Sequence, residues 1–93
     1  MKFAFIIMGN FDSGKDHAEM QGESVRMIGV SSIEEACKVA KGLQAQGIDC
    51  IELCGAFEES GARKVIEATN NKIPVGYVTH LPEQDPLFKA LFG

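Results

Sequence analysis

Apolar residues along this chain fall into short runs separated by stretches of helical spacing. The first run, Phe3–Met8, is apolar on both alternating faces, which predicts a central strand covered from two sides. Residues 24–30 alternate less cleanly, with Arg26 opposite its apolar neighbours, and predict an edge strand. Short apolar runs at 48–54 and 74–80 predict two further strands.

Helices are predicted between and after these strands. Ser32 and Glu35 form a capping-box signature, and the helix that follows is expected to end at Gly47. A second helix is expected from about residue 58 to residue 69. The tail predicts a short helix with one apolar side, formed by Leu87, Phe88, Leu91 and Phe92.

Strands that alternate with helices predict an α/β fold with a mainly parallel sheet. We expect one domain over residues 1–93, with a βαβαβ core at 24–80 preceded by the central N-terminal strand, four strands in all. Residues 13–21 could form a short helix, capped by Ser13, or only a loop. In such sheets, ligands bind at the carboxyl ends of the strands.

Composition narrows the classes of function. The 93 residues carry a net charge of −4 without a cluster of basic residues, which argues against binding to nucleic acid. No apolar run approaches the roughly 20 residues that a membrane-spanning helix needs, so no membrane partner is expected. Three cysteines fit reduced thiols in the cytoplasm better than a disulfide framework.

The first loop carries a spacing close to that of a phosphate-binding P-loop. Gly9 is followed by Gly14 and Lys15, but Asp16 stands where the motif requires Ser or Thr. Asp12 and Asp16 also place two negative charges where phosphates would have to bind. An ordinary loop is therefore favoured over a nucleotide site, and no cofactor is predicted.

A second loop suggests a small-ligand site. The chain runs from a strand through Gly55 to a helix whose first amides, near Glu58–Gly61, would face the crevice at the strand ends. A helix N-terminus suits a phosphate or carboxylate, although a plain βα turn has the same pattern. The expected ligand-binding residues are Gly9, Asn10, Cys54, Gly55, Ala56, Phe57, Thr79 and His80.

The cysteines offer a second kind of chemistry. Cys54 ends a strand before a helix, and His80 ends the neighbouring strand, so the two could form a nucleophile and its base. Cys37 and Cys50 are expected to be small core residues. A zinc site from Cys54, His80 and His17 is disfavoured because no two of these ligands are closely spaced, and no metal is predicted.

Glu52 is an unusual residue because its carboxylate falls inside an apolar strand. A buried carboxylate needs a partner or takes up a proton, and Tyr77 and Arg26 are the candidate donors. The alternative is that this face of the sheet is only partly covered. As an acid or base, Glu52 would complete an enzyme site with Cys54 and His80.

Three segments carry a resemblance to a known family. "IELCGAF" at 51–57, "VIEAT" at 65–69 and "IPVGYV" at 73–78 resemble a family of short bacterial α/β proteins of unknown function, over nearly the whole chain. The resemblance implies an α/β fold and a cytoplasmic protein, and it carries no activity.

These patterns favour a small α/β protein that binds a small polar or anionic ligand at the carboxyl ends of its strands. An enzyme that uses Cys54 and His80, and an interaction module without a ligand, are the alternatives. The apolar side of the tail must be covered, so we expect a homodimer, with docking on the same chain as the alternative.

Overall fold

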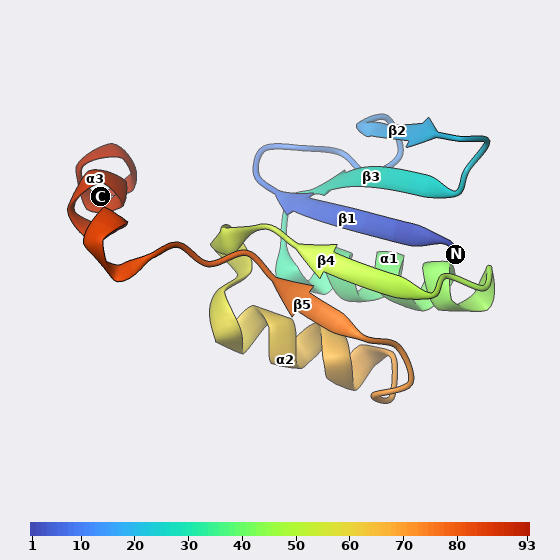
Figure 1. Ribbon diagram of the computed structural model, residues 1–93. Coiled ribbons are helices and arrows are strands. Elements are labelled where there is room, and N and C mark those ends of the chain that lie inside the picture. Colours follow the sequence, from blue (N-terminus) through green and yellow to red (C-terminus); the bar gives the residue numbers. More distant parts are fainter.

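The computed structural model describes residues 1–93 as a five-stranded sheet with α1 and α2 on one side and α3 beyond the ends of the strands (Figure 1). The strands are β1 (Phe3–Met8), β2 (His17–Met20), β3 (Val25–Val30), β4 (Cys50–Leu53) and β5 (Val75–Tyr77). The α-helices are α1 (Ile33–Ala45), α2 (Glu58–Ala68) and α3 (Asp85–Phe92), and the 3₁₀ turns are η1 (Gly55–Phe57) and η2 (Pro82–Gln84).

The sheet is mixed, with the strand order β2-β3-β1-β4-β5. β1 pairs in parallel with β3 and β4, and β4 pairs in parallel with β5, which confirms an α/β domain with a mostly parallel sheet. The predicted count of four strands is wrong, because residues 13–15 form a turn and β2 then pairs antiparallel with β3. The strand at 24–30 is therefore not an edge strand.

Both helical crossovers leave one face of the sheet uncovered. The β3-α1-β4 and β4-α2-β5 connections step in the same direction along the sheet, so right-handed crossovers place α1 and α2 on the same face. The connection from β1 to β3 contains β2 instead of a helix. The expectation that the first strand is covered from two sides is consequently wrong, although β1 is the central strand.

The core lies between the sheet and the two helices. Ala4 and Ile6 of β1 are fully buried there, and Phe57 packs among them with 1% of its surface exposed. The predicted cap of α1 is present, since the Ser32 hydroxyl accepts a hydrogen bond from the Glu35 amide at 3.0 Å. The Glu35 carboxylate bonds to other residues, described below, and not to the Ser32 amide.

The opposite side of the sheet is apolar, and no helix covers it. We call it the open face, and register and strand alternation assign to it Phe3, Phe5, Ile7, Val25, Met27, Cys50 and Glu52. α3 lies beyond the carboxyl ends of the strands, away from the sheet (Figure 1), with Leu91 and Phe92 each 76% exposed. Neither α3 nor any other helix is long and apolar enough to cross a membrane.

Candidate functional site

The loop after β1 binds its own carboxylates. The Gly14 amide donates to Asp12 Oδ1 at 2.9 Å, and the Asp12 amide donates to Asp16 Oδ2 at 2.7 Å. The Ser13 amide donates to Glu35 Oε2 at 3.3 Å. A P-loop needs these amides for phosphate oxygens, and here carboxylates already occupy them. The Gly-rich spacing therefore forms a self-satisfied turn.

Glu35 is the most strongly hydrogen-bonded carboxylate of this region. It accepts from the Ser13 hydroxyl at 2.7 Å, from the Ser31 amide at 2.6 Å and from the Ser31 hydroxyl at 2.9 Å. These donors favour the charged form, so the pKa of Glu35 falls to about 2, with the Ser13 hydroxyl as the largest cause. Glu35 thereby joins the first loop to the start of α1.

The residues predicted to bind a ligand follow neighbouring strands. Each of three neighbouring strands is followed by some of them: β1 by Gly9 and Asn10, β4 by Cys54 and η1, and β5 by Thr79 and His80. All of them therefore lie at the carboxyl ends of the strands. Phe57 is the exception, since its side chain is buried in the core. The amides of Asn10, Thr79 and His80 have no acceptor within the protein.

The backbone at Glu58, where α2 begins, is strained. Its φ of 57° and ψ of −177° lie in a region that residues other than glycine rarely adopt and that recurs at functional sites. Glu58 and Glu59 make the first turn of α2 acidic, and Arg63, one turn further along the helix, is paired with Glu59 at 2.7 Å. The negative charge of this turn disfavours an anion beside it.

Cys54 and His80 have separate partners. The Cys54 sulfur accepts a hydrogen bond from the Met8 amide at 3.3 Å. His80 Nε2 lies 2.5 Å from Asp85 Oδ1, and the His80 ring stacks on Phe88 with centroids 3.9 Å apart. The Cys54–His80 pair stays a prediction from sequence, because the contacts of both side chains lead elsewhere.

Glu52 lies on the open face, away from both of its expected partners. Its carboxylate covers Gly76, where an added Cβ would stand 2.8 Å from Glu52 Oε2. Tyr77 packs toward the core on the helix side, and Arg26 also lies on that side. Neither candidate donor reaches Glu52, and of the two alternatives the partly covered face describes it.

The two remaining cysteines are half-buried and free. Burial raises the pKa of Cys37, whose thiol lies 3.6 Å from the Lys64 carbonyl oxygen between α1 and α2. Burial also raises the pKa of Cys50, with the nearby Glu52 charge as a second cause. Both thiols are therefore less readily ionised than an exposed cysteine.

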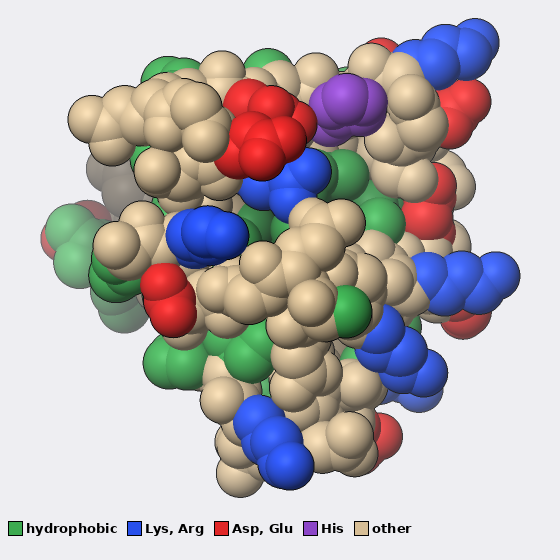
Figure 2. Space-filling model, turned by 90° about the vertical axis from the view of Figure 1, so that its right-hand side faces the viewer, with side chains coloured by type: hydrophobic (Ala, Val, Ile, Leu, Met, Phe, Trp, Pro, Cys, Tyr) green, Lys and Arg blue, Asp and Glu red, His purple; other side chains and the backbone are tan.

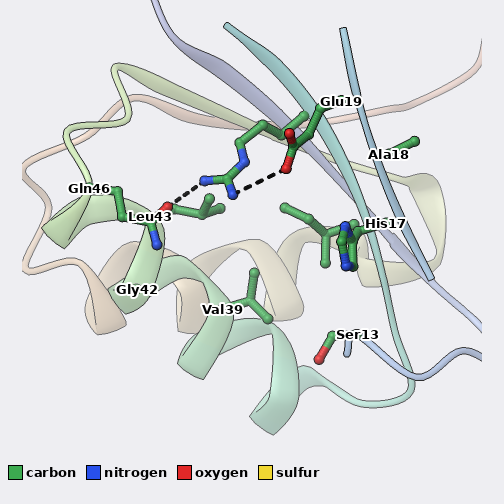
Figure 3. Close-up of a pocket in the computed structure, with 10 residues that line it drawn as sticks. Ser13, His17, Ala18, Glu19, Val39, Gly42, Leu43 and Gln46 are labelled. Carbon is green, nitrogen blue, oxygen red and sulfur yellow. Dashed lines mark hydrogen bonds and ion pairs between the residues drawn. The ribbon is translucent and has the colours of Figure 1, made fainter. Parts of the chain in front are cut away.

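A hollow that the sequence did not indicate lies between the β2–β3 ribbon and α1. It has a volume of about 260 Å³, and Arg26 extends across it toward Glu19 on β2 and Gln46 at the end of α1 (Figure 3). We call it the Arg26 hollow. The other lining residues are Ser13, His17, Ala18, Ile28, Val39, Gly42 and Leu43. The hollow depends on β2, so the missed strand is the reason that sequence patterns gave no sign of it.

A family model described as a family of unknown function (DUF6506) matches residues 1–93. The chain belongs to this family. For this DUF6506 chain, neither the curated proteins nor the solved structures gave a match.

Proposed function

We propose that the protein acts as a homodimer, in which α3 of each copy covers the open face of the other. The observation that carries this proposal is that one small chain leaves two apolar surfaces uncovered, the open face and the outer side of α3. Burying one large apolar side chain contributes roughly 1.5–3 kcal/mol, a large term for a domain of this size. Exposed apolar patches of this kind mark interfaces.

The two surfaces also complement each other in charge. Glu52 is the charged side chain of the open face, and it has no ion pair. Lys89 lies beside Phe92 on the rim of the apolar side of α3 and is likewise unpaired. Docking of α3 onto the open face would bring these opposite charges together.

The position of α3 favours a second copy as the occupant. The contacts of His80 with Asp85 and Phe88 hold the start of α3 against the chain that leaves β5, so that the helix projects beyond the sheet. Five strands spaced about 4.8 Å apart, with three to six residues each at about 3.3 Å, form a face about 24 Å wide and roughly 10–20 Å long. In a dimer each copy would contribute this face and its own α3, and a stable interface buries roughly 800 Å² per partner.

Light scattering at high micromolar concentration tests the proposal. The wild-type chain should have the mass of a dimer, whereas Leu91→Asp on α3 and Met27→Asp on the open face should each give a folded monomer. Both side chains are exposed in the single chain, so these changes should spare its fold. Ala45→Asp adds the same charge to an exposed site on α1 and should leave the dimer intact.

Exchange of the charges of Glu52 and Lys89 tests whether α3 of one copy contacts the open face of the other. Glu52→Lys and Lys89→Glu should each raise the dissociation constant, and the double variant should recover part of the loss. A monomeric wild-type chain that is destabilised by deletion of residues 87–93 would instead show that α3 docks on its own sheet.

A second candidate function is the binding of a small polar ligand at the carboxyl ends of the strands, supported by the strained backbone of Glu58. Melting temperatures in phosphate, as the anionic probe, and in ribose, as the neutral probe, would test it. A saturable rise with ribose is expected. The absence of a shift with either compound at tens of millimolar, beyond a chloride control, would exclude this site.

A further inference from the structure

The Arg26 hollow exists because β2 extends the sheet past the helices. The side chains of His17 and Glu19 point from β2 toward α1, and no second helix fills the space beneath them (Figure 3). A second hollow of about 300 Å³ adjoins the first, since Arg26 and Gln46 line both. Arg26 thus stands inside a larger recess with space on two sides of its guanidinium group.

The charged groups of the hollow are only loosely paired. Arg26 Nη2 and Glu19 Oε1 are 3.6 Å apart, beyond the 2.7–2.9 Å of a charge-assisted hydrogen bond, and the two side chains are 24% and 35% exposed. Arg26 Nη1 donates to Gln46 Oε1, which leaves other donors of the guanidinium group available. The hollow therefore offers one cationic and one anionic group side by side.

Part of the lining of the hollow is apolar. Val39 and Leu43 of α1 and Ile28 of β3 line it. A Cβ added at Gly42 would have no atom within 4 Å, so packing does not require glycine at this helical position. Glycine inside a helix costs roughly 0.5–1 kcal/mol relative to alanine, and here its effect is to keep the hollow open.

We propose that the Arg26 hollow binds a small zwitterion with an aliphatic group, of the size and chemistry of a branched-chain amino acid. Its carboxylate would bind Arg26, its ammonium group would bind Glu19, and its aliphatic part would contact Leu43 and Val39. The volume of about 260 Å³ leaves room for a molecule of this size.

The surface charge around the hollow agrees with this class of ligand. Figure 2 shows acidic and basic side chains interspersed on this side of the molecule, without a broad patch of one sign. This surface is not complementary in charge to a polyanion such as a nucleotide, whereas it is complementary to a molecule that carries both charges.

Titration with L-leucine, followed by amide resonances of the ¹⁵N-labelled protein, tests the proposal. Saturable shifts are expected at residues that line the hollow. Two analogues act as probes of each charge: 4-methylpentanoate lacks the ammonium group, and 3-methylbutylamine lacks the carboxylate. Each should bind at least tenfold more weakly than leucine, because one charge of the hollow is then left without a partner.

Variants of the two charged residues locate the site. Arg26→Gln and Glu19→Gln should each weaken leucine binding at least tenfold. The pair formed by Arg63 and Glu59 on α2 provides matched controls, so Arg63→Gln and Glu59→Gln should bind leucine as the wild-type chain does.

Gly42→Leu is a further test that changes no charge, which matters if Arg26→Gln or Glu19→Gln disturbs the fold. It places a strong helix former in open space and fills the hollow, so it should keep the melting temperature and abolish binding. Three results would each overturn the proposal: no saturable shift at 10 mM leucine, equal binding of leucine and 4-methylpentanoate, or undiminished binding by Gly42→Leu.

Discussion

Gly29 and Gly42 differ in whether their surroundings leave room for a side chain. Phe11 folds back over Gly29 of β3, and a Cβ added there would stand 2.7 Å from Phe11 Cγ. Gly42 faces the Arg26 hollow and has no such neighbour. The first glycine is required by packing, and the second is not.

Gly29→Ala should therefore lower the free energy of unfolding by roughly 1–3 kcal/mol, because the Phe11 ring must move. Gly42→Ala should raise it by roughly 0.5–1 kcal/mol, because alanine is the better helix former. Urea unfolding of both variants measures the two changes. Equal effects of the two substitutions would contradict this assignment.

Glu35 gives the fold an acid-sensitive contact at the scale of one side chain. Its pKa of about 2 in the folded state lies below the ordinary value of 4.5. The contribution to stability is therefore complete above about pH 4.5 and is lost as the pH falls toward 2. Glu35→Gln should lower the melting temperature at pH 7 and give a shallower loss of stability between pH 4.5 and 2.

The control for this experiment is Glu34→Gln, which changes an exposed carboxylate on the neighbouring position. It should leave both the neutral melting temperature and the acid dependence close to those of the wild-type chain. Parallel acid profiles of Glu35→Gln and the wild-type chain would show that other carboxylates determine the acid sensitivity.

At the scale of elements, the first loop and β2 decide which sites this domain has. Carboxylates bind the loop amides, and the Lys15 side chain makes no hydrogen bond or ion pair. β2 lengthens the sheet at its edge and forms a wall of the Arg26 hollow.

Lys15→Ala should change the free energy of unfolding by less than about 0.5 kcal/mol, as for other surface substitutions without contacts. It should also leave any response to Mg²⁺ and ATP unchanged, because carboxylates already bind the amides of Asp12, Ser13 and Gly14 that a P-loop would use for phosphates. A micromolar affinity for ATP that depends on Mg²⁺ and disappears in this variant would restore the nucleotide interpretation.

The helices and parallel strands were predictable from sequence because their signals are local. The Ser32 cap and the apolar spacing of α1, α2 and α3 give direct physical signals of helices. β2 was missed because all four of its residues are exposed, so no alternation between buried and exposed positions marks it. The Arg26 hollow and the single-sided cover of the sheet both depend on that strand, and neither could be predicted without it.

At the scale of the whole molecule, the uncovered apolar surfaces make assembly part of stability. If α3 covers the open face of a second copy, folding and association are linked by mass action. A tenfold increase in protein concentration then favours the dimer by about 1.4 kcal/mol. The effect should be visible in the melting temperature of the wild-type chain.

We expect the melting temperature to rise by roughly 3–6 °C for each tenfold increase in concentration, because about 1.4 kcal/mol acts on a folding unit of twice this length. Leu91→Asp should melt at a lower temperature that does not depend on concentration, and Ala45→Asp should behave as the wild-type chain. A wild-type melting temperature that is independent of concentration would contradict the dimer.

The central place of β1 has a consequence for the newly synthesised chain. β1 precedes both of its neighbours, β3 at residues 25–30 and β4 at residues 50–53. After β3 has emerged from the ribosome, the second edge of β1 stays unpaired until β4 has been synthesised. At about 5–20 residues per second this takes roughly 1–5 s. An unpaired edge of an apolar strand is a template for aggregation. During this interval, the nascent chain presents to chaperones a strand that the folded protein holds at its centre.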